Sequence, residues 1–65
     1  MVGFVKRLVK DRNYGFIRGD NRMEYFFHRE DFEDQWELLG EGDQVTFDDV
    51  VSQKGPRAAN VRFKN

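Results

Sequence analysis

Three aromatic residues and one histidine stand at alternate positions in two short runs of the sequence. Tyr14 and Phe16 flank Gly15, and Phe26 and His28 flank Phe27. Side chains two positions apart in a β-strand lie on the same face, so each pair would share a face of its strand. Flat rings on one face are suited to stacking on unpaired nucleic-acid bases. We therefore interpret these four residues as a candidate base-stacking surface.

Cationic side chains occur near these rings and near the end of the sequence. Lysine and arginine neutralise phosphates and release counterions, which makes them the natural companions of a stacking surface. The candidates for contact with a nucleic-acid backbone are Lys6, Arg7, Lys10, Arg12, Arg29, Lys54 and Arg57.

The charges are segregated along the sequence although the net charge is only −1. Residues 1–29 carry a net charge of +4, residues 30–53 carry −9, and residues 54–65 carry +4. If the two ends pair in one sheet, their positive charges share a region and the acidic middle lies elsewhere. Because local potential decides whether a polyanion binds, the acidic pI of about 5.7 does not exclude a nucleic-acid ligand.

The elements that would position these residues are strands. Aromatic and β-branched residues occur in short runs separated by turn-forming residues. Between the third and fourth runs, the segment 31–39 has room for a helical turn, which Gly40 and Gly42 would end. The expected strands are Gly3–Lys10, Tyr14–Arg18, Met23–Phe27, Gln44–Val51 and Ala58–Phe63.

Five short strands in 65 residues favour a small closed barrel over a sandwich. A barrel has one interior, so alternation along each strand separates core residues from outer ones. We expect the interior to be filled by Ile17, Tyr25, Phe27, Val45, Phe47, Ala59 and Val61. Tyr14, Phe16, Phe26 and His28 would then stand outside, where several exposed aromatic residues indicate a binding surface.

The length, the composition and the hydropathy pattern further limit the class of protein to which this sequence can belong. Sixty-five residues suffice for one domain, spanning residues 1–65, and the sequence has no cysteine for disulfides or thiolate metal sites. No apolar run approaches the roughly 20 residues of a membrane span. Charged Lys6 and Arg7 interrupt the place where a signal peptide needs its apolar stretch. We expect a soluble cytoplasmic monomer.

The sequence gives little support to an enzyme. Its one histidine belongs to the aromatic face, so Ser52 and Thr46 lack a base, and Asp48 and Asp49 would point to opposite faces of a strand. Metal-ligand spacings and a phosphate-binding glycine loop are also lacking. We expect no catalytic residues, no metal, no cofactor and no small-molecule substrate.

Four segments together resemble the cold-shock domain family. Residues 12–17 read Arg-Asn-Tyr-Gly-Phe-Ile and resemble the first ribonucleoprotein motif, Lys-Gly-Phe-Gly-Phe-Ile; residues 25–28 read Tyr-Phe-Phe-His and resemble the second, Val-Phe-Val-His. Residues 40–47 are similar to the family's Glu-Glu-Gly-Gln-x-Val-x-Phe stretch, and residues 55–61 to its Gly-Pro-Gln-Ala-Ala-Asn-Val segment. The resemblance runs from end to end and implies an all-β, five-stranded antiparallel OB-type Greek-key barrel.

The resemblance also implies roles for single residues. Tyr14, Phe16, Phe26 and His28 match base-stacking positions, and Lys6 and Arg12 match basic contacts near phosphates. Trp36 matches a stacking phenylalanine on the loop after the third strand, although a hydrophobic plug over the barrel end is an alternative for this residue.

The sequence departs from the family pattern at several positions. Arg7 stands where the family has an exposed tryptophan, Leu8 where it has a phenylalanine, and Arg29 where it has another stacking phenylalanine. The planar guanidinium of arginine still stacks on bases and adds charge. Asn13 replaces a glycine and tolerates positive φ. Tyr25 and Phe27 are bulkier than the usual inward valine pair, so either the barrel is repacked or the Tyr25 hydroxyl reaches its rim.

Two hypotheses about function follow. The first is binding of single-stranded RNA or DNA with low sequence specificity, with the role of an RNA chaperone or a regulator of transcription or translation implied by the resemblance. The alternative is a divergent barrel that binds a protein partner and has weakened nucleic-acid binding. The sequence does not distinguish RNA from DNA, since no contact to a 2′-hydroxyl is identified.

Overall fold

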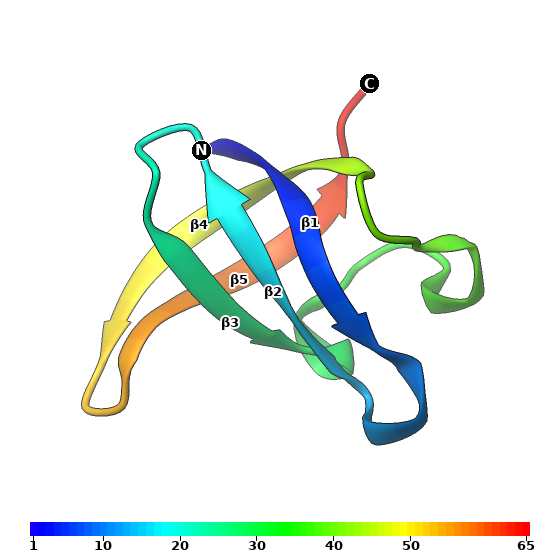
Figure 1. Ribbon diagram of the computed structural model, residues 1–65, viewed down its shortest axis with the longest axis horizontal. Helices are drawn as coiled ribbons and strands as arrows, with labels where there is room; N and C mark the ends of the chain where they lie inside the picture. The colour runs from blue at the N-terminus through cyan, green and yellow to red at the C-terminus, as the bar shows by residue number, and fades with distance from the viewer.

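The computed structural model describes residues 1–65, except for the side chain of Val51. Five strands form a closed barrel in the order β1-β2-β3-β5-β4 (Figure 1). Each strand overlaps one of the expected runs, and β5 begins three residues earlier than predicted. Their bounds are β1 (Val2–Val9), β2 (Tyr14–Gly19), β3 (Glu24–His28), β4 (Gln44–Ser52) and β5 (Gly55–Phe63).

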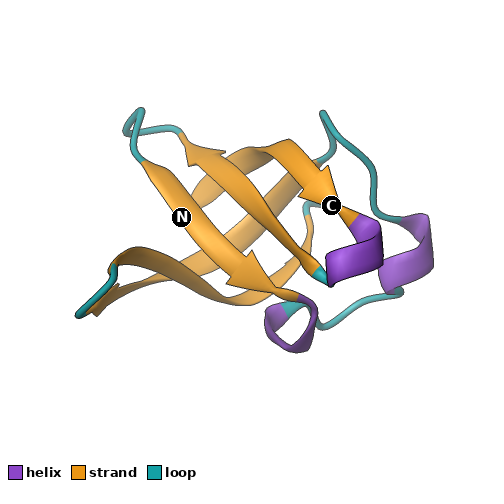
Figure 2. Ribbon diagram, turned by 60° about the horizontal axis from the view of Figure 1, so that its bottom comes forward, coloured by secondary structure: helices purple, strands orange, loops and turns teal.

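Three short 3₁₀ turns complete the secondary structure: η1 (Lys10–Arg12), η2 (Arg29–Asp31) and η3 (Trp36–Leu38). Figure 2 shows these turns gathered at one end of the barrel, away from the tip of the β4–β5 hairpin. The helical turn expected in the segment 31–39 is η3. Among the described residues, no helix is long and apolar enough to cross a membrane.

One strand pair departs from the antiparallel pairing of the others. Strands β3 and β5 pair in parallel, with Phe26 opposite Arg57, whereas the other four pairs are antiparallel. In a closed barrel, the strand direction reverses at every antiparallel pair. Because five is an odd number, the five strands cannot all pair in antiparallel fashion, and at least one pair must be parallel. The parallel contact is also what brings Arg57 beside the outer face of β3.

The interior agrees with the prediction at six of seven positions. Ile17, Tyr25, Phe27, Val45, Phe47 and Val61 are all buried. The prediction of Ala59 is wrong, since Ala58 is buried instead. Two irregularities break the alternation there: Asn60 has a left-handed backbone with φ of 52°, and the β4–β5 register shifts between Thr46 and Asp48. Ala58 and Val61, three positions apart, therefore both face inward.

The large inward side chain of Tyr25 fits because its hydroxyl reaches the rim. The residue is fully buried, and its hydroxyl donates to Asp49 Oδ2 at 3.2 Å and accepts from Asn21 Nδ2 at 2.8 Å. Of the two alternatives for this residue, a repacked barrel or a hydroxyl that reaches the rim, the structure shows the second.

Gly15 allows β1 and β2 to approach closely beneath the outer aromatic residues. A Cβ atom at this position would lie 2.7 Å from the backbone oxygen of Arg7 and 2.9 Å from the ring of Phe27. Real side chains do not tolerate such contacts, so the position between Tyr14 and Phe16 requires glycine. The absence of a side chain fixes the spacing of the strands that carry the two rings.

Candidate nucleic-acid interface

The strand register aligns four residues in one row across four strands. Arg7 on β1 lies opposite Phe16 on β2, Phe16 opposite Phe26 on β3, and Phe26 opposite Arg57 on β5. Directly paired residues lie side by side on one face of a sheet. The outer face therefore carries a row in which two phenylalanine rings stand between two arginines.

A second row extends the aromatic area, because Tyr14 on β2 lies opposite His28 on β3. The Tyr14 ring stacks on that of Phe26 with centroids 5.7 Å apart, and the Phe16 ring lies edge-on to both at 5.9 Å. All four outer residues are half-buried while their inward neighbours are buried, as alternation predicted. We call Tyr14, Phe16, Phe26 and His28 the aromatic platform.

His28 is fixed in orientation by the turn that follows it. Its Nδ1 accepts the backbone N–H of Glu30 at 3.1 Å, and its own backbone N–H donates to Asp31 Oδ2 at 2.9 Å. A ring nitrogen that accepts carries no hydrogen, so the neutral ring has its N–H at Nε2. This leaves a hydrogen-bond donor at the far side of the ring, in addition to its flat face.

A bulge in β1 places two cations beside Phe16. The β1–β2 register shifts between Val5 and Arg7, so Lys6 is the extra residue and both Lys6 and Arg7 are exposed. Lys6 Nζ donates to Glu24 Oε2 at 2.6 Å, and this hydrogen bond and the lysine charge lower the pKa of the Glu24 carboxyl. Because exposed pairs are weak, a phosphate can replace Glu24 as the partner of Lys6.

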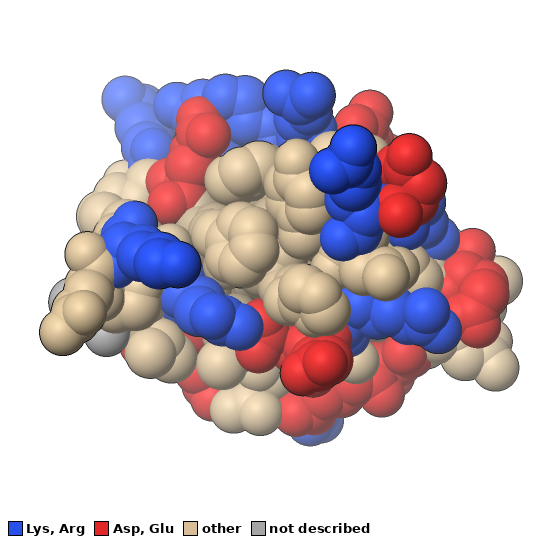
Figure 3. Space-filling view, turned by 90° about the horizontal axis from the view of Figure 1, so that it is seen from below, with Lys and Arg blue, Asp and Glu red and all other residues tan. Residues whose placement is uncertain are grey.

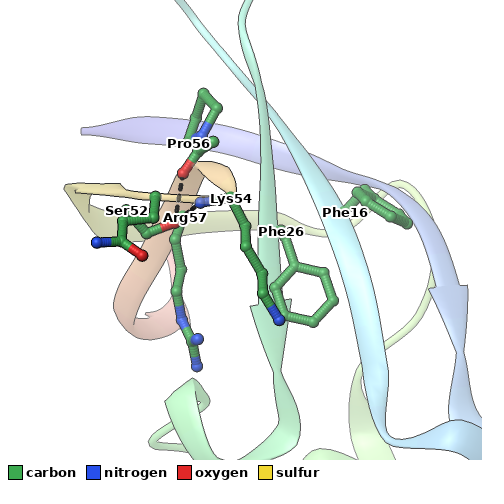
Figure 4. A pocket seen from close by; sticks show the side chains of 8 residues that line it. Phe16, Phe26, Ser52, Lys54, Pro56 and Arg57 are labelled. Carbon is green, nitrogen blue, oxygen red and sulfur yellow. Dashed lines mark hydrogen bonds between the residues drawn. The ribbon is translucent and has the colours of Figure 1, made fainter.

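Two hollows lie on either side of Phe16. The smaller one, of about 220 Å³, is lined by Lys6, Arg7, Phe16 and Glu24. The larger one, of about 730 Å³, is lined by Phe16, Phe26 and the β4–β5 hairpin residues 52–57, which include Lys54 (Figure 4). The space-filling view in Figure 3 shows uncharged surface between groups of lysine and arginine side chains, with several acidic side chains along the lower margin.

Arg57 lies against the platform. Its guanidinium donates to Asp31 Oδ2 at 3.0 Å, and its Cζ lies 5.7 Å from the centre of the Phe26 ring. The anchor Asp31 is a residue that sequence reasoning did not single out. It belongs to an acidic segment and is 26 positions from Arg57, so only the folded structure reveals the pairing.

Trp36 requires a correction. It was predicted to stack on a base, but it is 6% exposed and packs edge-on against Phe27 and Phe32, each with ring centroids 6.1 Å away. The residue is the hydrophobic plug that the alternative described. Lys10 contacts the same residue, since its Nζ donates to the backbone oxygen of Trp36 and lies 5.5 Å from the centre of the indole ring.

Two further predicted cations lie in the turns near Tyr14 and His28. Arg12 ends η1 and Arg29 begins η2, and both are exposed. The backbone N–H of Arg29 donates to the oxygen of Asn13 at 2.8 Å, which ties the two turns together. Among the described side chains, Arg7, Arg12 and Arg29 form no ion pair, so their charges face solvent.

Comparison with known proteins gives the family. The model of the 'Cold-shock' DNA-binding domain matches residues 1–63. The chain belongs to the cold-shock domain family. It is 43% identical over 60 residues to Cold shock protein 1 of Lactiplantibacillus plantarum, covering 91% of each chain. It is 45% identical over 62 residues to a Cold shock-like protein of Aquifex aeolicus, covering 92% of this chain and 89% of that one.

A solved structure supports the same fold. The structure titled drosophila Unr CSD456 matches 98% of this chain and 26% of its own, with a TM-score of 0.82 and 22% identity. The family and the barrel agree with the all-β OB-type fold expected from the sequence. Members of the cold-shock domain family are nucleic-acid-binding domains.

Proposed function

We propose that this cold-shock domain, as one domain over residues 1–65, binds single-stranded RNA or DNA across the aromatic platform with low sequence specificity. The observation that carries the proposal is the cross-strand row of Arg7, Phe16, Phe26 and Arg57. Rings at its centre offer stacking surface to any base, because every base has a flat face. Cations at its two ends offer partners to the backbone phosphates.

The path of the strand follows from the two hollows. A strand that crosses the platform along the row passes from the hollow beside Lys6 and Arg7, over Phe16 and Phe26, to the hollow beside Lys54 and Arg57. Arg12 and Arg29 lie toward the Tyr14 and His28 end of the platform, where they serve a neighbouring phosphate. Lys10 is exposed at the same end of the barrel, and we include it among the candidate phosphate contacts although it also contacts Trp36.

The biological role we propose is that of an RNA chaperone or a regulator of transcription or translation in the cytoplasm. A ligand that binds only unpaired strands shifts the pairing equilibrium toward them by mass action. A monomer with one platform suffices for this, and no catalytic residue, cofactor or small-molecule substrate takes part in it.

The test is the affinity of the protein for a fluorescently labelled, unstructured oligonucleotide of about ten pyrimidines, measured by anisotropy. Truncation of a stacking ring costs roughly 1–3 kcal/mol, so Phe16→Ala should weaken binding about 5- to 100-fold. Phe4→Ala is the matched control, because Phe4 is an exposed phenylalanine on β1 that pairs with Arg18 outside the platform. Equal affinities of the Phe16→Ala variant and the unmodified protein, both shown to be folded, would contradict the platform.

The alternative function, a protein-interaction module, makes a different prediction for the same experiment. A barrel that has exchanged nucleic acid for a protein partner would bind no oligonucleotide even at low salt. Failure of the folded, unmodified protein to bind under those conditions would transfer the search to protein partners.

A further inference from the structure

The guanidinium of Arg57 lies beside the platform without resting in contact with the centre of the Phe26 ring. A flat group resting on the middle of the ring would have its atoms about 3.5–4 Å away, whereas Arg57 Cζ is 5.7 Å from the centroid. Arg57 therefore does not occupy the stacking position over the centre of the Phe26 ring. Figure 4 shows Arg57 and Lys54 extending along the β5 side of Phe26.

Asp31 holds Arg57 in this place. The Asp31 side chain is 17% exposed, and the oxygen that accepts from Arg57 also accepts the backbone N–H of His28. That second bond is part of the turn η2, so the backbone sets the position of the carboxylate. An arginine that is already ordered loses less side-chain entropy when it contacts a ligand.

A base that stacks on Phe26 meets this guanidinium at its edge. Guanidinium has five N–H donors in a fixed fork and no acceptor. Among the described contacts, one guanidinium nitrogen of Arg57 donates to Asp31, so the other donors can contact a base. The fork matches two adjacent acceptors on one base edge. Guanine offers O6 and N7, and cytosine offers O2 and N3, whereas adenine and uracil place a donor beside each acceptor on their open edges.

We propose that Arg57, positioned by Asp31, makes the platform selective for guanine or cytosine at the place next to Phe26. The proposal rests on the proposed function, since it concerns a base already stacked on the platform. The other places on the platform stack any base, so one position carries the preference while the overall specificity stays low.

The experiment uses an oligouridylate of about nine residues in which one uridine at a time is replaced by guanosine, cytidine or adenosine. The readout is the ratio of each affinity to that of the parent oligonucleotide. For the unmodified protein, guanosine or cytidine at one position should raise affinity about tenfold, and adenosine should not. The base that gives the larger gain in affinity, guanosine or cytidine, identifies the pair of acceptor atoms that Arg57 contacts.

Arg57→Lys keeps the charge and removes the fork, so this variant should bring the ratio to within about twofold of one. Asp31→Asn should lower the ratio with Arg57 intact, because the anchoring charge is lost. Arg62→Lys is the matched control: Arg62 is also on β5 and also paired with a carboxylate, that of Glu33, and the ratio should not change.

Four results would overturn the proposal. An unchanged ratio in Arg57→Lys would show that Arg57 does not select the base. Equal gains for guanosine and adenosine would show that purine stacking, and not reading of acceptors, sets the preference. Binding of the parent oligonucleotide without any preference removes this inference alone, whereas absence of binding by every oligonucleotide removes the proposed function with it.

Discussion

Trp36 shows how one buried ring closes the end of the barrel at the residue scale. Its contacts with Phe27 and Phe32 make it part of the core, so truncation leaves a cavity. We predict that Trp36→Ala destabilises the protein by about 3–5 kcal/mol, as measured by urea unfolding followed by circular dichroism. Leu38→Ala is the control, because Leu38 lies in the same turn and is 66% exposed.

A second substitution at Trp36 tests whether this residue acts as a plug or stacks on a base. Trp36→Phe keeps an aromatic ring in the core and should stay folded, with an oligonucleotide affinity within about twofold of the unmodified protein, since a group that never touches the ligand contributes no binding energy. If a folded Trp36→Phe variant bound the oligonucleotide much more weakly, Trp36 would have to be counted among the residues that contact the ligand.

Glu24 provides a second test at the residue scale. With its pKa lowered by Lys6, this carboxyl is charged at neutral pH and competes with phosphate for the lysine. We predict that Glu24→Gln raises oligonucleotide affinity about two- to fivefold at low salt, in line with the strength of an exposed ion pair. Asp20→Asn is the control, since Asp20 is an exposed carboxylate in the β2–β3 turn. An affinity that falls in Glu24→Gln would mean that Glu24 itself contacts the ligand.

At the scale of elements, the turn between β1 and β2 depends on a left-handed residue. Asn13 follows η1 as its C-terminal cap with φ of 62°, and its backbone oxygen accepts the N–H of Arg29. We predict that Asn13→Ala lowers stability by about 1–2 kcal/mol while Asn13→Gly lowers it by much less, because only glycine adopts this conformation without strain. Equal urea midpoints for the two variants would show that the turn changes its backbone when the residue changes.

The elements also show where sequence reasoning succeeds and where it stops. Alternation in β2 and β3 placed every ring correctly, since these strands pair without interruption from Tyr14 to Arg18. It failed at Ala59, because a bulge and a left-handed Asn60 add a residue that no local pattern announces. It could not find Asp31 beside Arg57, and it left Trp36 open between a stacking role and a plug, because both depend on how distant segments meet.

At the scale of the whole molecule, the net charge is −1, but cations are concentrated around the platform. The basic ends of the sequence meet there through the β1–β2–β3–β5 order of the barrel. For single strands, each phosphate contact contributes about −0.7 to the slope of log affinity against log salt. With two to five contacts in use, we predict a slope between about −1.4 and −3.5, measured by anisotropy over a salt series.

Comparison of one variant with one control tests whether the salt dependence arises from cations beside the platform. Arg7→Gln removes a cation at the end of the cross-strand row, so its slope should be less steep by about 0.7. Arg62→Gln removes the same charge from a site on β5 that pairs with Glu33, and its slope should match that of the unmodified protein. Net charge is identical in the two variants, so a difference between them reflects position alone. Equal slopes in both would mean that the ligand responds to the overall charge of the barrel and not to the arginine beside Phe16.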